Sequence, residues 1–382
     1  MKEGWEYKKL DDICSSIEDG DWIESKDQSP NGIRLIQTGN IGNGSYKDKK
    51  DNAKYISEET FKRLHCTEIF EGDILVSRLP DPVGRACTLP DLGCRCITAV
   101  DCSILKIKKD LVCNAWITYF MQSQAYFTII NSQCTGSTRL RITRKKLAEI
   151  LIPVPPLSEQ QSIVDYLDSA FAKIDAMKAN AEKALGEAKA LFQASLKEML
   201  EPKEGWEEKT LPEISENLDS IRKPVTKNKR TAGVYPYYGA SGIVDYVDDY
   251  LFDENLLCIS EDGANLLMRT YPIAFPISGK VWVNNHAHVL RFKSMTTQNY
   301  VEYYFSGLKL DEYITGAAQP KLTQKALNSI IINMPISLED QQSIVETLDS
   351  LKSKVDRLQA NYDKISQECD ALKQAILRQV FE

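Results

Sequence analysis

The stretch Gln160-Gln161-Ser162-Ile163-Val164 occurs twice in this chain of 382 residues, because the same five residues return at Gln341 to Val345. Each copy opens a long segment with helical periodicity, and each follows a block of mixed, strand-like sequence. An internal repeat decides the architecture before any local feature does. The pentapeptide therefore predicts a duplicated chain with the order domain, helix, domain, helix.

The repeat extends on both sides of the pentapeptide. Two further pairs of segments match without a gap: Lys2–Glu6 with Lys203–Glu207, and Thr135–Thr143 with Thr315–Thr323. The second pair places Arg141 and Lys321 at the same position. Between these framing segments the two mixed blocks share almost no sequence. The pattern suggests two modules that are held alike but read different things.

The mixed blocks predict an α/β (α+β) fold. Short apolar runs such as Ile33–Ile36 and Ile74–Val76 are typical of buried strands, and glycine-rich turns separate them. We expect two globular domains, each followed by one long helix, with an internal pseudo-two-fold repeat. The expected boundaries are 1–152 and 203–334 for the globular domains, and 153–202 and 335–382 for the helices.

Each long helical segment has apolar residues at alternating intervals of three and four, which is a heptad pattern. A narrow apolar seam on a helix of ~40 residues should pair with another helix, so we expect the two copies to form an antiparallel coiled coil. The expected seam and partner-contact residues are Ile163, Leu167, Phe171, Ile174, Leu185, Ile344, Leu348, Leu351, Val355, Leu358, Ile365 and Leu372.

Composition is that of an ordinary soluble globular protein, with 43% hydrophobic and 26% charged residues. No apolar run reaches ~18 residues and no signal-peptide core begins the chain, so we expect a cytoplasmic protein without a membrane span. The ten cysteines are scattered, which favours reduced thiols over disulfides. The formal charge of −7 argues against nucleic-acid binding only if it is taken globally, because only the surface that faces phosphates must be positive.

Catalytic motifs are missing from the sequence. It contains no phosphate-binding P-loop, no nucleophile elbow and no Asn/Asp-Pro-Pro-aromatic tetrapeptide of the kind that amino-methyltransferases use. Cys94, Cys96 and Cys102 lack the Cys-x2-Cys spacing of a zinc knuckle. His286 and His288 would share a face on a strand, but no third metal ligand declares itself. We therefore predict no catalytic residue, no metal and no cofactor in this chain.

Basic and polar side chains gather in the mixed blocks and suit contact with DNA. Arginine and lysine pair with guanine edges, asparagine pairs with adenine edges, and lysine, serine and tyrosine position phosphates. A solvated face explains a single basic run equally well, and hydrophobic core is the favoured interpretation of the Tyr235–Tyr238 aromatics. The candidate DNA contacts are Lys47, Lys49, Lys50, Arg78, Arg139, Arg141 and Arg144 in the first block, and Lys227, Lys229, Arg230, Tyr238, Ser241, Lys280, Asn284, Asn285, His286 and Lys321 in the second.

The chain resembles the specificity (S) subunits of Type I restriction-modification enzymes over essentially its full length. Pro155 to Val164 looks like the start of that family's conserved helical region, and the Thr-Gly segments at Thr135 and Thr315 look like the ends of its target-recognition domains. Tyr235–Gly242 and Asn284–His288 resemble one class of those domains. The second helix start departs slightly, with Asp340 in place of Glu159 and one added residue after Pro335.

The resemblance implies a non-catalytic subunit that binds double-stranded DNA and positions two modification subunits on it. Those partners would carry S-adenosylmethionine and methylate adenine, and two restriction (motor-nuclease) subunits could join for cleavage. Each recognition domain would read one half of an asymmetric bipartite target. The helices would set the spacing, since ~40 residues at 1.5 Å per residue span ~60 Å, more than one ~34 Å turn of DNA.

Two interpretations from other classes remain open. The chain could be a stand-alone DNA-binding or scaffold protein that uses its coiled coil to dimerise, and purification without partners would distinguish this from a subunit. A self-contained methyltransferase or nuclease is the third interpretation, and a methyl-transfer assay on the purified chain would test it.

Overall fold

The computed structural model describes residues 4–136, 140–316 and 319–382, and the chain forms two compact units. Unit 1 comprises Met1–Asn180 with Lys364–Glu382, and unit 2 comprises Ala181–Asp363. Each unit contains one globular domain and parts of both long helices. Among the described residues, no helix is both long enough and apolar enough to cross a membrane.

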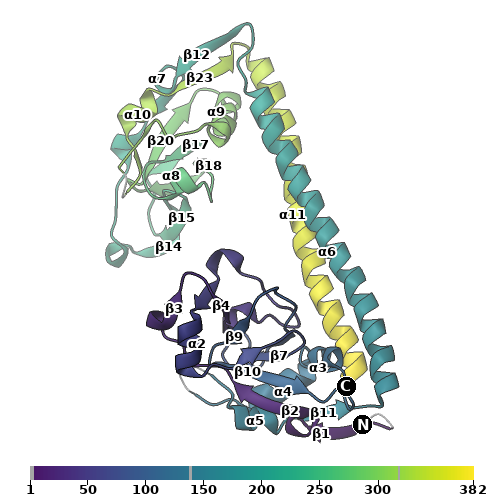
Figure 1. Cartoon of the computed structure of the whole chain (residues 1–382). Helices are drawn as coiled ribbons and strands as arrows, with labels where there is room; N and C mark the ends of the chain where they lie inside the picture. Colours follow the sequence, from purple (N-terminus) through teal and green to yellow (C-terminus); the bar gives the residue numbers. More distant parts are fainter. Residues whose placement is uncertain (1–3, 137–139, 317–318) are drawn as a thin grey trace. The chain divides into compact units, whose positions relative to one another are not determined.

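The globular domain of unit 1 is built from short strands and helices (Figure 1). In chain order they are β1 (Glu6–Lys9), α1 (Leu10–Ile13), β2 (Cys14–Asp19), β3 (Gln28–Ser29), β4 (Ile33–Ile36), β5 (Lys54–Ile56), α2 (Glu58–Leu64), β6 (Glu68–Ile69), β7 (Ile74–Ser77), β8 (Ala86–Thr88), β9 (Cys96–Thr98), β10 (Cys102–Ile107), α3 (Asn114–Phe120), α4 (Gln124–Gln133), α5 (Arg144–Ala148) and β11 (Leu151–Val154).

The globular domain of unit 2 follows the same plan. Its elements are β12 (Trp206–Thr210), α7 (Leu211–Ile214), β13 (Ser215–Asn217), β14 (Ala232–Gly239), β15 (Gly242–Val247), β16 (Phe252–Asp253), β17 (Leu256–Ser260), α8 (Asn265–Met268), β18 (Ala274–Ile277), β19 (Lys280–Val283), β20 (Ala287–Phe292), α9 (Met295–Gly307), β21 (Ile314–Thr315), β22 (Lys321–Leu322), α10 (Gln324–Asn328) and β23 (Ile331–Pro335).

Strand order shows that the duplication covers the whole domain and not only its frame. The antiparallel sheet β2-β10-β7-β8 of unit 1 corresponds to β13-β20-β17-β18 of unit 2. The second sheet is β5-β4-β9-β6 in unit 1, extended by β3, and β15-β14-β19-β16 in unit 2, with one parallel pair at the same place in each. The two blocks therefore share a fold although they share almost no sequence, because buried strands constrain polarity more than identity.

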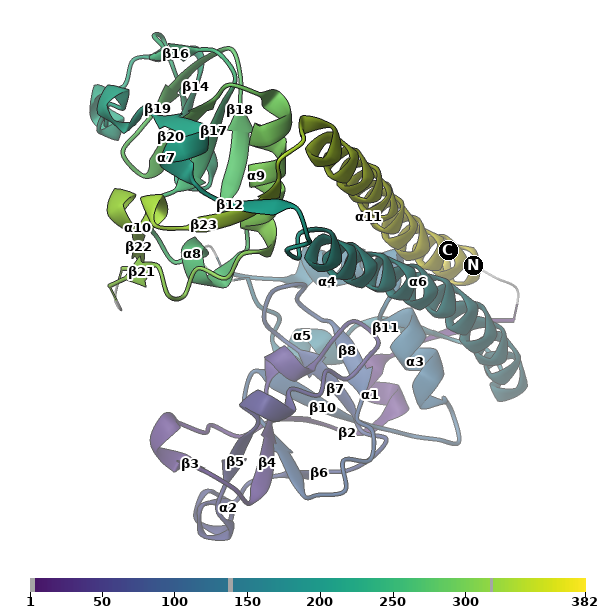
Figure 2. The same ribbon diagram turned by 90° about the horizontal axis from the view of Figure 1, so that it is seen from above.

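Short strands tie each domain to its helix. β1 pairs with β11, and β12 pairs with β23, so the matched Lys-Glu-Gly-Trp-Glu segments lead into the strands that precede the helices. In unit 2, Figure 2 shows this β12–β23 pair at the opposite end of the domain from β14, β16 and β19. The domain therefore has one end fixed to the helices and another end remote from them.

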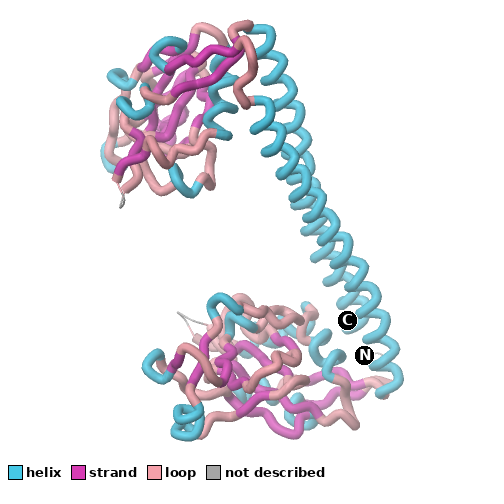
Figure 3. Tube along the Cα trace, turned by 45° about the horizontal axis from the view of Figure 1, so that its top comes forward, coloured by secondary structure: helices cyan, strands magenta, loops and turns pink. Residues whose placement is uncertain are grey.

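The long helices are α6 (Leu157–Met199) and α11 (Leu338–Phe381), and both are helical throughout (Figure 3). In unit 1, Lys373 Nζ lies 2.5 Å from Asp175 Oδ1 and Lys178 Nζ lies 3.4 Å from Asp370 Oδ1. The residue number rises on one helix as it falls on the other, which confirms the antiparallel pairing.

The predicted seam is largely buried or half-buried. Leu167, Phe171, Ile174, Leu185 and Leu348 are buried, and these seam positions are half-buried: Ile163, Ile344, Leu351, Val355, Leu358 and Ile365.

Leu372 departs from the predicted seam, with 48% of its surface exposed. The last turns of α11 instead bury Leu377, Val380 and Phe381 in the core of unit 1, where the Phe381 ring lies 4.9 Å from that of Trp116. Contact with the globular domain, which a heptad pattern does not represent, decides which side of this last part of the helix is buried.

Candidate nucleic-acid interface

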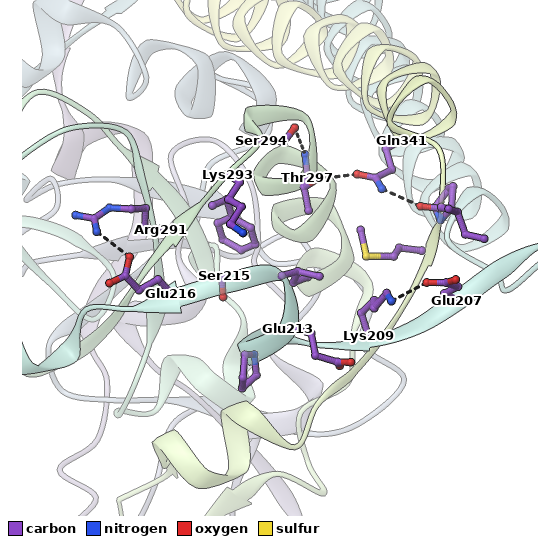
Figure 4. Close-up of a pocket in the computed structure, with 16 residues that line it drawn as sticks. Glu207, Lys209, Glu213, Ser215, Glu216, Arg291, Lys293, Ser294, Thr297 and Gln341 are labelled. Atoms are coloured by element: carbon purple, nitrogen blue, oxygen red, sulfur yellow. Dashed lines mark hydrogen bonds and ion pairs between the residues drawn. The ribbon is translucent and has the colours of Figure 1, made fainter.

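The first glutamine of each repeated pentapeptide anchors a helix to its domain. Gln160 is fully buried; its Oε1 accepts from the Cys113 backbone N–H at 3.0 Å, and its Nε2 donates to the carbonyls of Leu111 and Pro155. Gln341 in unit 2 donates to the Pro335 carbonyl at 2.8 Å and accepts from Thr297 Oγ1 at 2.9 Å (Figure 4). The first glutamine of each pentapeptide thus closes the corresponding junction in its unit.

Aromatic side chains repeat this junction further along the helices. Tyr119 on α3 donates to Asp168, and Tyr303 on α9 donates to Asp349, each at 2.5 Å. The two aspartates follow the anchoring glutamines at the same spacing. The two domains therefore contact their helices through equivalent atoms, even where the neighbouring sequence has diverged.

A pocket of about 590 Å³ lies beside the unit 2 junction (Figure 4). Charged side chains on its wall bind one another: Lys209 Nζ lies 2.6 Å from Glu207, and Arg291 Nη1 lies 2.8 Å from Glu216. Gln341 and Thr297 also face it, already bonded to each other. These contacts make the pocket part of the domain–helix junction, where these charged and polar side chains are engaged in structure.

Three of the predicted DNA contacts of unit 1 meet at the end of β7. Arg144 Nε lies 3.9 Å from Asp19 Oδ2, and Arg78 Nε lies 3.6 Å from Asp19 Oδ1. Arg141 approaches Asp101 at 3.8 Å. Arg141 and Arg144 are exposed and available to phosphates, whereas Arg78 is only 5% exposed and donates to the Val100 carbonyl. Arg78 therefore lies beneath the arginine pair.

Lys47, Lys49 and Lys50 form a separate exposed group. Asp48 between them binds the guanidinium of Arg34 at 2.5 Å and also approaches Lys50 at 3.8 Å. The lysines thus lie beside a partly neutralised carboxylate and can still present their ammonium groups to solvent. Arg139, the remaining candidate of this unit, lies outside the described residues.

The equivalent place in unit 2 carries an ion-pair network around Glu261. Glu261 binds Arg222 at 2.6 Å and Lys321 at 3.0 Å. Asp219 in turn binds His288 Nδ1 at 2.6 Å and Arg222 at 3.2 Å. Lys321 is thus held by Glu261, and about half of its side chain is exposed to solvent.

Burial and pairing act in opposite directions on these carboxyl groups. Burial by itself would raise the pKa of Asp219, but the hydrogen bond and charge of His288, together with Arg222, lower it below its usual value. Burial likewise opposes ionisation of Glu261, yet hydrogen bonds from Arg222 and Lys321 lower its pKa. Both groups are therefore held as carboxylates.

The groups of this network that could bind a metal are hydrogen-bonded or ion-paired with one another and with neighbouring residues. Asp219, Glu261 and His288 offer ligand atoms within 4.8 Å of one another. However, His288 Nδ1 lies 2.6 Å from Asp219 and its Nε2 lies 2.8 Å from the Leu322 carbonyl, so both ring nitrogens already have partners. His286 does not share this site, because its exposed ring binds Asp262 at 2.9 Å. The two close histidines thus have separate structural partners.

The other unit 2 candidates lie around β14 and β15. Arg230 packs over the Tyr237 ring at 4.2 Å and binds Asp245 at 2.9 Å, while Tyr237 is buried as core. Asn284 is 5% exposed and caps the His286 backbone N–H at 2.8 Å. The half-buried Tyr238 stacks on Phe275. Over the whole of unit 2, the candidates with exposed side chains are Lys227, Lys229, Ser241, Lys280, Asn285, His286 and Lys321.

The acidic residues that bind the basic candidates in both units were not predicted from the sequence. Asp219, Glu261 and Arg222 hold the network of unit 2, and Asp19 receives the arginines of unit 1. Arg85 was also not predicted; it is 9% exposed and donates to several loop carbonyls, including those of Ile41 and Thr38. A usable signal was present for Glu261, since a carboxylate directly after an apolar strand must find a partner.

A family model described as Type I restriction modification DNA specificity domain matches the chain twice, over residues 2–185 and 203–367. The chain belongs to this family. The two matched segments each combine one globular domain with the larger part of one long helix, in agreement with the duplicated fold.

Individual relatives agree with this assignment. The chain is 24% identical to the EcoKI specificity subunit of Escherichia coli K12, a match that covers all of this chain and 89% of that protein. It is 36% identical over 143 residues to a putative type I restriction enzyme specificity subunit of Haemophilus influenzae, but that match spans only 37% of this chain and 36% of the relative.

Solved structures show the same fold. A chain from a study of complex assembly and conformational transition of the type I R-M system superposes with a TM-score of 0.75 over 100% of this chain and 98% of that chain, at 16% identity. The HsdS subunit of Thermoanaerobacter tengcongensis gives a TM-score of 0.54 at 18% identity, with 100% and 97% of the two chains covered.

Proposed function

We propose that this chain is the non-catalytic DNA-recognition subunit of a Type I restriction-modification complex, and that each globular domain reads one half of an asymmetric bipartite target. The observation that carries the proposal is one fold present twice with different surface chemistry at the same place. In unit 1, Arg141 lies beside Asp101 and Arg144 lies beside Asp19, whereas in unit 2 Lys321 binds Glu261. Two readers with different side chains favour two different half-sites.

The exposed basic residues supply the means of contact. In unit 1 these are Arg141, Arg144 and the Lys47–Lys50 group, and in unit 2 they include Lys321, Lys280, Lys227 and Lys229. Such side chains provide phosphate contacts and the salt dependence that accompanies them. The buried Arg78 and Asn284 and the half-buried Arg230 would support these contacts from below.

The long helices would keep the two globular domains apart and would bind two modification subunits. A helix rises 1.5 Å per residue, so the heptad seam of α6 and α11 offers a ruler of fixed length. The modification subunits would bring S-adenosylmethionine and the adenine methylation chemistry, and two restriction subunits would add cleavage. In this division of labour the chain itself supplies recognition and spacing.

Insertion of one heptad into each helix tests the ruler. The facing positions Lys189 and Gln359, joined by a hydrogen bond of 2.7 Å, mark where both insertions would keep the seam in register. Seven residues add ~10.5 Å, so methylome mapping of the variant should show the same half-sites with about three more base pairs between them. Unchanged spacing, or new half-site sequences, would contradict the proposal.

A self-sufficient DNA-binding protein is the second candidate, supported by the basic groups on both domains. Salt-dependent binding to short duplexes distinguishes the two. The subunit proposal expects sequence-specific binding to require added modification subunits, whereas a stand-alone protein would discriminate the target by itself.

A further inference from the structure

The β14–β15 hairpin of unit 2 is an apolar ribbon with little cover. β15 is the outer strand of its sheet. Ile243, Val244 and Tyr246 on it are 47%, 56% and 50% exposed, and Val234 on β14 is 78% exposed. Val244 is the extra residue at a register shift, between the pairs Tyr238–Ile243 and Tyr237–Asp245. An edge strand with three exposed apolar side chains is unusual in a water-soluble domain and indicates a partner.

Positive charge flanks this ribbon. Arg230 joins the basic turn Lys227–Lys229 to the ribbon through its ion pair with Asp245 on β15 and its contact with the Tyr237 ring. Asp245 is thereby neutralised, while Lys227 and Lys229 remain exposed. On β19, Lys280 Nζ lies 4.7 Å from the centre of the Tyr250 ring and is also exposed. Cationic groups beside an apolar strand suit a partner that is itself anionic and carries apolar groups.

The corresponding strands of unit 1 have no such ribbon. β4 is buried at each of its four positions, and the outer edge of β5, the equivalent of β15, is paired with β3. The edge that is free on β15 in unit 2 is therefore covered by β3 on the equivalent strand of unit 1. It also lies at the end of the domain that is remote from the β12–β23 joint, in both views of the fold (Figures 1 and 2).

We propose that the β14–β15 ribbon enters the major groove of the unit 2 half-site, where Ile243, Val244 and Tyr246 contact thymine methyl groups while Lys227, Lys229 and Lys280 bind the flanking phosphates. The major groove admits a two-stranded ribbon, and the C5-methyl of thymine is its one apolar feature. This inference rests on the proposed function and assigns to one hairpin the discrimination of thymine from cytosine.

Uracil substitution tests the contact directly. The full complex with modification subunits is titrated with target duplexes, found by methylome mapping, in which each thymine is replaced in turn by deoxyuridine. Loss of one buried methyl group should weaken binding about fourfold at one or more thymines of a single half-site. The Val244→Ser, Ile243→Ser and Tyr246→Ser variants should remove that sensitivity at the thymine each side chain contacts.

Met268→Ser is the matched control, because Met268 is 72% exposed and lies on α8, outside the ribbon. Its complex should retain the full uracil effect. Equal binding of all thymine and uracil duplexes, with specific target binding intact, would overturn the ribbon inference and leave the proposed function standing. Absence of sequence-specific binding by the complex would overturn both. Retained DNA binding with loss of complex assembly in the ribbon variants would assign the ribbon to a protein partner and contradict the inference.

Discussion

The end of β7 in unit 1 and the end of β17 in unit 2 occupy the same place in the same strand order, yet they carry opposite charges. Ile142 N–H donates to the Arg78 carbonyl in one, and Leu322 N–H donates to the Glu261 carbonyl in the other. The backbone contact is retained while the side chain changes from a cation to an anion. Duplication has thus kept the framework that positions a surface and has released the surface itself to vary.

The junctions between each domain and its long helix, in contrast, are alike in the two units. Gln160 and Gln341 on the long helices donate to the Pro155 and Pro335 carbonyls, and Tyr119 and Tyr303 of the domains donate to helix aspartates. These groups are buried or hydrogen-bonded to a helix, so a change would leave a polar atom unsatisfied. Residues that face only solvent or a ligand carry no such penalty, and there the two units differ.

The largest difference between the units should appear on removal of the central aspartate. Asp219→Ala leaves Arg222 and the buried His288 without their carboxylate, and should cost about 3–5 kcal/mol of stability. Asp19→Ala in unit 1 removes ion contacts of 3.6–3.9 Å and the 3.1 Å hydrogen bond from the buried Ser103 hydroxyl, and should cost about 1–2 kcal/mol. Denaturant unfolding followed by hydrogen exchange in each unit measures both, and equal costs would contradict the assigned difference.

Substitution of the anchoring glutamines, Gln160 and Gln341, should cause the next largest loss of stability. Gln160→Ala leaves one backbone N–H and two carbonyls without this hydrogen-bond partner. Gln341→Ala leaves one carbonyl and the Thr297 hydroxyl without theirs. Each variant should lose about 1–3 kcal/mol, with the larger loss for Gln160. Thr297→Val provides the control, since it removes the hydroxyl without opening the joint. A larger loss at Gln341 would show that the joints are not equivalent.

Acid should affect unit 2 through its carboxylate network. The pKa values of Asp219 and Glu261 are lowered from 3.8 and 4.5, so the network's contribution is full above those values and is lost as pH falls through the lowered ones. Between pH 6 and pH 3 the Glu261→Gln variant should therefore lose about 1–2 kcal/mol less stability than the unaltered chain. Parallel pH profiles of the denaturation midpoint for the two proteins would contradict this assignment.

The smallest effects should be equal in the two units. Tyr119→Phe and Tyr303→Phe each remove one hydrogen bond to a helix aspartate, and each should cost about 1 kcal/mol. Thermal unfolding of the two variants compares them directly. A difference above about 1 kcal/mol would break the symmetry of the joints.

The framework could be predicted from sequence because it rests on repetition. The paired pentapeptides and the heptad seam predicted two domains, two antiparallel helices and their order, and the strands at Ile33–Ile36 and Ile74–Val76 were located closely. Leu372 was misassigned because the end of α11 packs on a domain and not only on α6. The common strand order of the two domains was missed, since polarity is retained there without identity.

The candidate interface could be predicted only by residue type. Basic side chains mark a surface suited to DNA, but Arg78 and Asn284 show that the same residue types also serve inside the fold. Their burial depends on partners distant in sequence, such as Val100 for Arg78. The Glu261 network required contacts between strands and loops that no local pattern contains.

The most direct test of two independent readers is a chain in which both domains are the first one. The matched strands β1 to β11 and β12 to β23 define the exchange, in which residues 6–154 replace residues 207–334. Because both joints use equivalent contacts, the chimera should assemble with the modification subunits. Methylome mapping should then show a target with two-fold symmetry, built from the original unit 1 half-site and its inverted copy. An unchanged asymmetric target would contradict the account.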